Sequence, residues 1–157
     1  MPVISDALDV SDALDVSDAP ETVDTRIDVL LVDDHPTFLR LARRFLEMED
    51  GIRVVGTERL GARALARAQE LQPDVVLVDL AMPDQHGLEV IPQLRAALPG
   101  LGIIAMTGMG INGFREAALA AGADAFLLKD TLDVELTPAI RHVAGARRTR
   151  VGTAALR

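Results

Sequence analysis

Five polar residues stand directly after short apolar runs of the sequence. They are Asp33, Asp34, Asp79, Thr107 and Lys129. Of the 16 basic residues, 15 are arginine and one is lysine, so a composition that avoids lysine nevertheless places its single lysine in this set. Carboxylates, a hydroxyl and an ammonium group in one pocket can bind a metal ion and an anion such as a phosphoryl group.

Three carboxylates held close together repel one another, and one of them would ordinarily take up a proton. A hard divalent cation removes this conflict, and Mg²⁺ favours oxygen ligands from carboxylates, carbonyls, water and phosphate. Lys129 adds a point charge for a phosphoryl oxygen, and Thr107 adds a hydroxyl donor. Phosphoryl transfer needs mainly positioning and charge neutralisation, and a carboxylate can accept the group. Asp79 is therefore the predicted nucleophile.

The elements that must position these residues alternate along the chain. Five short runs that are apolar at nearly every position predict strands of a parallel sheet buried on both faces; they are Ile27–Val32, Arg53–Thr57, Val75–Val78, Leu101–Met106 and Ala123–Leu128. Apolar residues at helical spacing predict five helices; these run from Pro36 to a closing Gly51, and over Leu60–Leu71, Leu88–Leu98, Phe114–Ala121 and about Leu132–Ala144. The alternation predicts an α/β fold, a doubly wound parallel sheet with its site at the carboxyl ends of the strands.

Charge and proline mark the expected limits of the folded part. Residues 1–25 hold seven acids and no lysine or arginine, so we expect an acidic, disordered, low-complexity tail. Residues 26–146 are expected to form one domain, and residues 147–157 a tail or linker stub. Pro138 lies inside the last predicted helix, which is therefore expected to be kinked or to start late, at Thr137.

The acidic tail contains a repeat. SDALDV occupies Ser5–Val10 and again Ser11–Val16, and a third copy begins at Ser17. A period of six residues matches neither a helix face nor a strand face well. The alternative to disorder is a short amphipathic segment that binds a partner through its leucines and valines.

The composition excludes several classes of protein. The net charge is −8 and residues 1–25 carry −7, so the rest of the chain sums to −1 and lacks the basic surface of a nucleic-acid-binding protein. Cysteine is absent, which excludes disulfides and thiolate metal sites. No apolar run reaches the ~18 residues of a membrane span, and the acidic N-terminus is no secretory signal. We therefore expect a cytoplasmic protein that binds neither nucleic acid nor membrane.

Together these motifs resemble the receiver domain of response regulators in two-component signalling, over about residues 26–146. The family's acidic pair matches LLVDDHP, and its phosphorylated aspartate matches Asp79 in VVLVDLAMPDQHG. The switch hydroxyl matches Thr107 in IIAMTG, and the family's lysine matches Lys129 in GADAFLLKD. DDHP and FLLKD further resemble receivers joined to a LuxR-type helix-turn-helix, but after Ala146 there is no room for one. A single-domain receiver or a fragment is expected.

The resemblance implies a flavodoxin-like sheet of order 2-1-3-4-5 with helices on both faces. It implies Mg²⁺ bound by Asp33 or Asp34, by Asp79 and by the backbone carbonyl of Ala81. It also implies that a histidine kinase or a histidine phosphotransfer protein phosphorylates Asp79. The chain would catalyse its own phosphorylation and dephosphorylation but is not otherwise expected to be an enzyme.

The resemblance further implies a conformational switch. Thr107 would move toward the phosphoryl group, and Phe126, three residues before Lys129, would turn inward. The face changed by these movements comprises the fourth predicted helix, the fifth strand and the last helix. That face would bind a downstream protein or a second copy in a homodimer.

Two other interpretations compete. Gly108, Gly110 and Gly113 match the G-x-G-x-x-G fingerprint of dinucleotide-binding domains, but they follow the fourth predicted strand rather than the first. That interpretation also leaves the acids and Lys129 unexplained. The third possibility is a receiver-like interaction module that is never phosphorylated, which the presence of all five site residues argues against.

The histidines receive no predicted site role. His35, His86 and His142 are not expected to form a metal cluster. His35 precedes Pro36 and is expected to cap the first helix.

Overall fold

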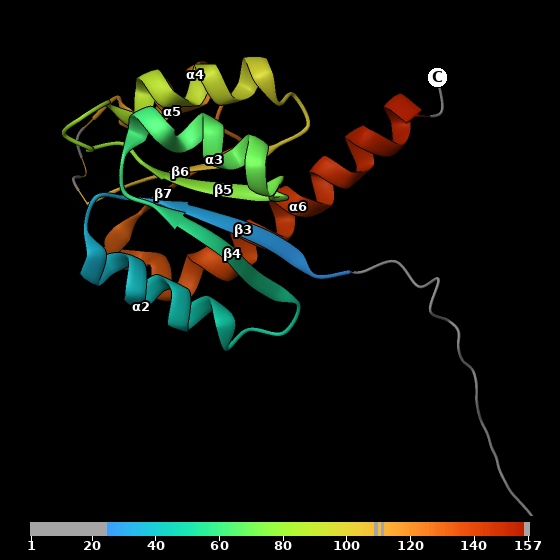
Figure 1. Ribbon diagram of the computed structural model, residues 1–157, viewed down its shortest axis with the longest axis horizontal. Coiled ribbons are helices and arrows are strands. Elements are labelled where there is room, and N and C mark those ends of the chain that lie inside the picture. Colours follow the sequence, from blue (N-terminus) through green and yellow to red (C-terminus); the bar gives the residue numbers. More distant parts are fainter. Residues whose placement is uncertain (1–24, 109, 111, 156–157) are drawn as a thin grey trace, which may run out of the picture.

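The computed structural model describes residues 25–108, 110 and 112–155, and their side chains as far as Arg148; the acidic repeat and its expected disorder lie outside these residues. The strands are β3 (Ile27–Val32), β4 (Ile52–Glu58), β5 (Val75–Asp79), β6 (Gly102–Thr107) and β7 (Ala125–Leu128). The helices are α2 (Pro36–Glu47), α3 (Ala64–Leu71), α4 (Gly87–Ala97), α5 (Phe114–Ala121) and α6 (Leu132–Ala155), with 3₁₀ turns η1 (Gly61–Arg63) and η2 (Lys129–Thr131). Strands and helices therefore alternate as predicted (Figure 1).

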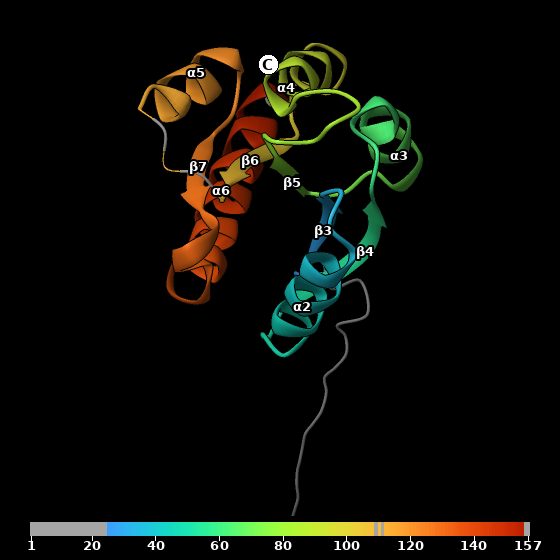
Figure 2. The same cartoon turned by 90° about the vertical axis from the view of Figure 1, so that its left-hand side faces the viewer.

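The sheet has the predicted topology. All its strand pairs are parallel, and the order across it is β4-β3-β5-β6-β7, which Figure 2 shows from edge to edge. In chain order this is 2-1-3-4-5, so the flavodoxin-like prediction is confirmed. β5 lies at the centre, with Val78 opposite Val32 of β3 and Asp79 opposite Met106 of β6. Every residue of β5 and β6 is buried because helices cover both faces of the sheet.

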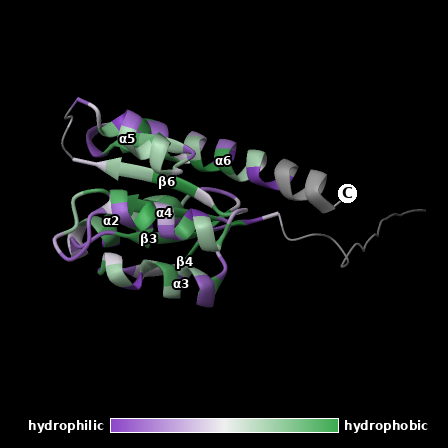
Figure 3. Cartoon of the chain, turned by 90° about the horizontal axis from the view of Figure 1, so that it is seen from above, coloured by the Kyte–Doolittle hydropathy of each residue, from purple (hydrophilic) through white to green (hydrophobic). Residues whose placement is uncertain are grey.

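Two layers of helices enclose the sheet (Figure 1). α2 and α6 cover one face, where Leu31 and Leu77 pack with Leu46 and Ile140. α3, α4 and α5 cover the other face, with the remaining strand side chains beneath them. Figure 3 shows apolar strands inside and hydrophilic stretches on the outer sides of the helices. Burial of this aliphatic surface, at about 25 cal/mol per Å², is the main force that holds the site's framework. No helix in the described part of the chain is long and apolar enough to cross a membrane.

Among the element boundaries that differ from the sequence prediction, two have a clear cause in hydrogen bonds. The helix expected from Leu60 opens as the turn η1, because Asp84 accepts the backbone N–H groups of Gly61 and Ala62 at 3.0 Å each. The last strand begins at Ala125 rather than Ala123, because the Ala123 N–H donates to the carbonyl of Ala118 at 3.0 Å and so closes α5.

α6 differs most from its prediction. It starts at Leu132, the earlier of the two predicted starts, and continues through Pro138 to Ala155, so residues 147–155 are helical rather than a tail or linker stub. The pattern missed this extension because no apolar stripe continues past Ala144. Polar contacts hold it instead: Arg147 Nη1 lies 3.2 Å from Asp74 Oδ1, and Arg148 Nη2 lies 3.4 Å from the carbonyl oxygens of residues 25 and 26.

Candidate functional site

The acidic pair lies where β3 ends, at the carboxyl edge of the sheet. Asp33 is fully buried, and its backbone N–H donates to the carbonyl of Glu58 at 3.0 Å, which extends the pairing with β4. Its Oδ1 accepts the backbone N–H of His35 at 2.9 Å and so holds the turn into α2. Asp34 is half-buried, and its Oδ1 is a buried atom with no hydrogen bond from the described residues. The pair thus offers one oxygen for a ligand beside two that already have partners.

Asp79 is the last residue of the central strand β5 and is 1% exposed. Its Oδ1 accepts the backbone N–H of Ala81 at 3.3 Å, whereas its Oδ2 is buried with no hydrogen bond from the described residues. The following loop folds back tightly onto the strand end. A Cβ on Gly87 would lie 2.7 Å from both Asp79 O and Leu80 Cα, so a glycine is needed for this close approach.

Lys129 follows β7 and reaches back over the carboxyl edge. Its Nζ lies 2.5 Å from Asp33 Oδ2 and 3.6 Å from Asp79 Oδ2, so its stronger ion pair is with Asp33. The same Nζ lies 4.2 Å from the centroid of the Phe38 ring, a cation–π contact. Thr107 ends β6 and is fully buried opposite Leu128 of β7. All five predicted residues therefore lie at one edge of the sheet.

The charges at this edge are poorly compensated. The pKa of Asp79 is raised above its ordinary value of 3.8, mainly because burial disfavours the charged form and then because Asp33 is negatively charged. Lys129 and the N–H of Ala81 act in the opposite direction, and the charge of Asp34 adds a smaller rise. Two of the three carboxylates, Asp33 and Asp79, share the ammonium group of Lys129, so added positive charge would stabilise the site.

The donor atoms fit a hard cation. One ligand atom from each of Asp33, Asp34, His35 and Asp79 lies within 4.8 Å of the others. Two members of this group, Asp34 and Asp79, each have a buried oxygen without a hydrogen bond from the described residues. Carboxylate oxygens suit Mg²⁺, whereas an imidazole nitrogen suits a transition metal better. The three acids are therefore the ligands that fit Mg²⁺, and His35 is a neighbour of the site.

The position predicted for His35 at the start of the first helix is confirmed, but its side chain has a different contact. It occupies the N-cap position of α2, but its side chain makes no capping hydrogen bond. Its Nδ1 instead lies 3.0 Å from Asp33 Oδ1 and 3.3 Å from Asp34 Oδ1, with the ring mostly exposed at the rim of the site. Its position directly after the two aspartates was the signal that could have revealed this contact. Phe38 carried no such signal, because its contact with Lys129 joins distant parts of the sequence.

The remaining predicted residues surround this centre. Phe126 lies in β7 opposite Ala105 and is partly buried against the core beneath α3, α4 and α5. The loop of Gly108, Gly110 and Gly113 follows β6 on the same edge, and a Cβ on Gly108 would lie 3.9 Å from Lys129 Cδ. Met109 and Ile111, within this loop, lie outside the described residues. These glycines follow the fourth strand of the chain, whereas the glycines of a dinucleotide-binding domain follow its first strand. Their position therefore argues against the dinucleotide interpretation.

Comparisons with known proteins agree with this geometry. The sequence matches the family described as "Response regulator receiver domain" over residues 29–141. Response regulator protein VraR of Staphylococcus aureus (strain NCTC 8325 / PS 47) is 36% identical over 118 residues, which are 75% of this chain and 56% of VraR. The chain therefore spans about half the length of the curated relatives it matches.

Among the solved structures that match, two are similar to most of the described part of the chain. A two-component response regulator of the LuxR family from Aurantimonas sp. SI85-9A1 gives a TM-score of 0.74 at 30% identity, covering 78% of this chain and 87% of that one. The response regulator domain of Thermotoga maritima CheB gives a TM-score of 0.71 at 27% identity, covering 76% of this chain and 97% of that one.

Proposed function

Because this chain belongs to the family of response regulator receiver domains, its role is phospho-acceptor signalling, and we propose that Asp79 is the acceptor. The observation that carries this proposal is the Asp79 carboxylate at the centre of the carboxyl edge. Its Oδ2 is buried, has no hydrogen bond from the described residues and lies 3.6 Å from Lys129 Nζ. The proposed donor is a histidine kinase or a histidine phosphotransfer protein.

The transfer forms a bond between a carboxylate oxygen of Asp79 and phosphorus and breaks the donor's P–N bond, and the leaving imidazole takes up a proton. The ammonium group of Lys129 lies within 4 Å of both Asp33 and Asp79. It can therefore turn from Asp33 to a phosphoryl oxygen on Asp79. Its cation–π contact with Phe38 supports the aliphatic stem in this position. The chain itself would catalyse this step and the later hydrolysis, and it would act on no other substrate.

Mg²⁺ is the proposed cofactor. The proposed ligands are Asp33 or Asp34, Asp79 and the backbone carbonyl of Ala81. Asp34 and Asp79 each have a buried oxygen without a hydrogen bond from the described residues, whereas both oxygens of Asp33 are hydrogen-bonded, to His35 and to Lys129. When bound, Mg²⁺ neutralises charge on the acids and on the transferred group. It would also lower the pKa of Asp79, which burial raises, and so favour the charged nucleophile.

Phosphorylation is proposed to act through two neighbouring strands. Thr107 lies at the buried end of β6, and Phe126 lies on β7 opposite Ala105, two residues before Thr107. A movement of Thr107 toward a phosphoryl group on Asp79 would change the packing beneath Phe126. The surface of α5, β7 and α6 would then have two states, one of which binds a downstream protein or a second copy of the chain. Neither nucleic acid nor membrane is a proposed partner.

Intact mass spectrometry tests the acceptor. The protein is incubated with a small phosphodonor, with and without Mg²⁺, beside Asp79→Asn. We expect one added phosphoryl group that requires Mg²⁺ and is absent from the variant. The matched control is Asp130→Asn, because Asp130 is an exposed acid beside Lys129 and its variant should be phosphorylated normally.

Two other results of this experiment would contradict the proposal that Asp79 is phosphorylated. Wild-type protein that binds Mg²⁺ but gains no mass would favour an interaction module that is never phosphorylated. A mass gain that persists in Asp79→Asn would place the acceptor at another residue.

A further inference from the structure

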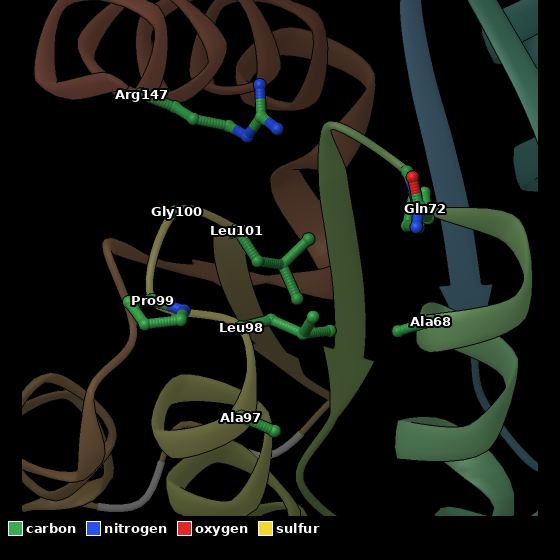
Figure 4. A pocket seen from close by; sticks show the side chains of 9 residues that line it. Ala68, Gln72, Ala97, Leu98, Pro99, Gly100, Leu101 and Arg147 are labelled. Carbon is green, nitrogen blue, oxygen red and sulfur yellow. The ribbon is translucent and has the colours of Figure 1, made fainter. Parts of the chain in front are cut away.

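A second candidate site lies at the amino edge of the sheet, opposite the acids. A cleft of about 300 Å³ separates the ends of α3 and α4 and is shown in Figure 4. Its walls are largely apolar, with Ala68 and Leu101 buried and the side chains of Leu98 and Leu101 directed toward α3. Arg147 of α6 extends across one side of the cleft. An apolar floor beside a guanidinium group fits a ligand that combines an aliphatic group with a carboxylate.

Arg147 has hydrogen-bonding capacity left for such a ligand. Its Nη1 pairs with Asp74 Oδ1 at 3.2 Å, but its Nε is buried with no hydrogen bond from the described residues. A buried donor without an acceptor destabilises the protein. A carboxylate in the cleft would remove that destabilisation and would bind a guanidinium group in its preferred planar geometry.

The next residue brings the start of the described chain to the same place. Arg148 Nη2 lies 3.4 Å from the carbonyl oxygens of Thr25 and Arg26. Arg148 is exposed and contacts no carboxylate among the described residues. Residues 1–24 therefore join the described part beside two arginines of α6, one of which lines the cleft.

We propose that the acidic repeat of this same chain docks in the Arg147 cleft. In SDALDV each pair of aspartates encloses Ala and Leu, and Val follows, so every copy offers the required acid beside an aliphatic side chain. One repeat carboxylate would accept from Arg147 Nε, and a neighbouring Leu or Val would lie against Leu98 and Leu101. Residues 1–25 carry seven acids and no basic residue, which complements the uncompensated charge of Arg148.

The helix dipoles weaken this attraction without reversing it. α3 and α4 both end at the cleft, and a helix C-terminus carries a partial negative charge of about one half. Arg95 already satisfies carbonyls beyond the end of α4, with Nη1 at 3.0 Å from Pro99 O and 2.7 Å from Leu101 O. Asp74 compensates part of the charge of Arg147, so the attraction for an acid comes from the Nε donor of Arg147 and from the charge of Arg148.

The chain is long enough for this contact. The second repeat copy ends at Val16, nine residues before Thr25, and an extended chain spans at most about 3.3–3.6 Å per residue. The nine residues can therefore reach about 30 Å, whereas the body of a helix with its side chains is about 10–12 Å across. A tethered segment of this length has an effective concentration in the millimolar range, so even a weak contact is populated.

Paramagnetic relaxation in the full-length protein tests the docking. The chain has no cysteine, so Ser11→Cys gives one attachment point for a nitroxide within the repeat. We expect the amide signals of Leu98, Gly100 and Leu101 to lose most of their intensity at low salt and to recover it at high salt. The amide signals of β7, an outer strand of the sheet, should keep their intensity.

Variants identify the contacts. Asp12→Asn with Asp15→Asn leaves the described fold unchanged and should restore the cleft signals, as should Leu14→Ser. Arg147→Ala should restore them as well, whereas Arg44→Ala, an exposed arginine on α2, should have no effect. Three results would overturn the proposal: unbroadened cleft signals in the labelled wild type, equal recovery in Arg44→Ala, or broadening that grows with protein concentration, which would make the occupant a second copy.

Discussion

The two edges of the sheet hold their acids in opposite states. At the carboxyl edge Lys129 pairs with Asp33 and Asp79 but not with Asp34, and Asp34 and Asp79 each have a buried oxygen with no hydrogen bond from the described residues. At the amino edge each acid has an arginine of its own, in the pairs Asp28–Arg53, Asp74–Arg147 and Asp124–Arg95. The same residue type therefore stabilises the fold at one edge and stores electrostatic repulsion at the other.

The acids of the amino edge thus contribute to stability, whereas the acids of the carboxyl edge serve the proposed function. Satisfied acids at the amino edge join α4, α5 and α6 to the starts of the strands, and their loss should affect folding. Unsatisfied acids at the carboxyl edge destabilise the isolated protein, and positive charge that arrives with a ligand should relieve them. The two edges should respond in opposite ways to removal of a charge.

The largest expected effect is on phosphorylation in Lys129→Ala. Loss of the single ammonium group should lower the initial rate with a small phosphodonor about 100-fold, the usual effect of losing one charge-stabilising donor. Intact mass against time measures the rate. Lys129→Arg keeps the charge with a different shape and should recover only part of the loss. An unchanged rate in Lys129→Ala would remove Lys129 from the proposed site.

The next effect concerns the amino edge. Arg95 donates to Gly122 O at 2.9 and 3.0 Å, to Leu101 O at 2.7 Å and to Asp124 Oδ2 at 2.8 Å. Arg95→Ala should lower the free energy of unfolding by about 2–4 kcal/mol, because several partly buried acceptors lose their donor. Urea denaturation measures this. Phosphorylation of the folded fraction should remain normal; a slowed reaction would mean that the two edges are coupled.

Gly87→Ala should affect both properties. The added Cβ would meet two backbone atoms at 2.7 Å, so the loop after Asp79 must shift. We expect a loss of about 1–3 kcal/mol in unfolding free energy and slower phosphorylation. Gly145→Ala is the matched control, because a Cβ there meets nothing within 4 Å and the residue lies in α6. Equal behaviour of the two variants would contradict the close packing described at the site.

The smallest expected effect is a pH-dependent gain in stability of the Asp79→Asn variant. The pKa of Asp79 is raised in the folded protein, so the folded state binds its proton more tightly than the unfolded state. Wild-type stability should therefore fall as pH rises from the ordinary value of 3.8 through the raised pKa. The variant lacks this fall and should be more stable at neutral pH by roughly 1–2 kcal/mol. Urea titrations at several pH values measure the difference, and Mg²⁺ should reduce it.

Much of the site was predictable because its signals are local in the sequence. Asp33, Asp79 and Thr107 directly follow or end buried strands, and the parallel topology then brings the strand ends together. Lys129 follows the last strand in the same way. The family resemblance added the backbone carbonyl of Ala81 as a metal ligand and the switch roles of Thr107 and Phe126, which composition and spacing alone did not provide.

What the sequence did not predict depends on contacts between distant residues. Phe38 contacts Lys129 only after α2 has packed on β3 and β4 and Lys129 has reached back from the end of β7. The extension of α6 depends on Arg147 meeting Asp74, a pair 73 residues apart, in a stretch without apolar periodicity. His35 was assigned to a helix cap from its position, and its ring lies against the aspartates instead.

The scarcity of lysine has a practical consequence for following the site in solution. Lys129 bears the only side-chain amine of the sequence, and that amine is ion-paired with two of the acids. Reductive methylation with isotope-labelled formaldehyde would therefore place its only side-chain probe at the carboxyl edge. The methyl resonance would report changes in the charge around Lys129 without any substitution in the chain.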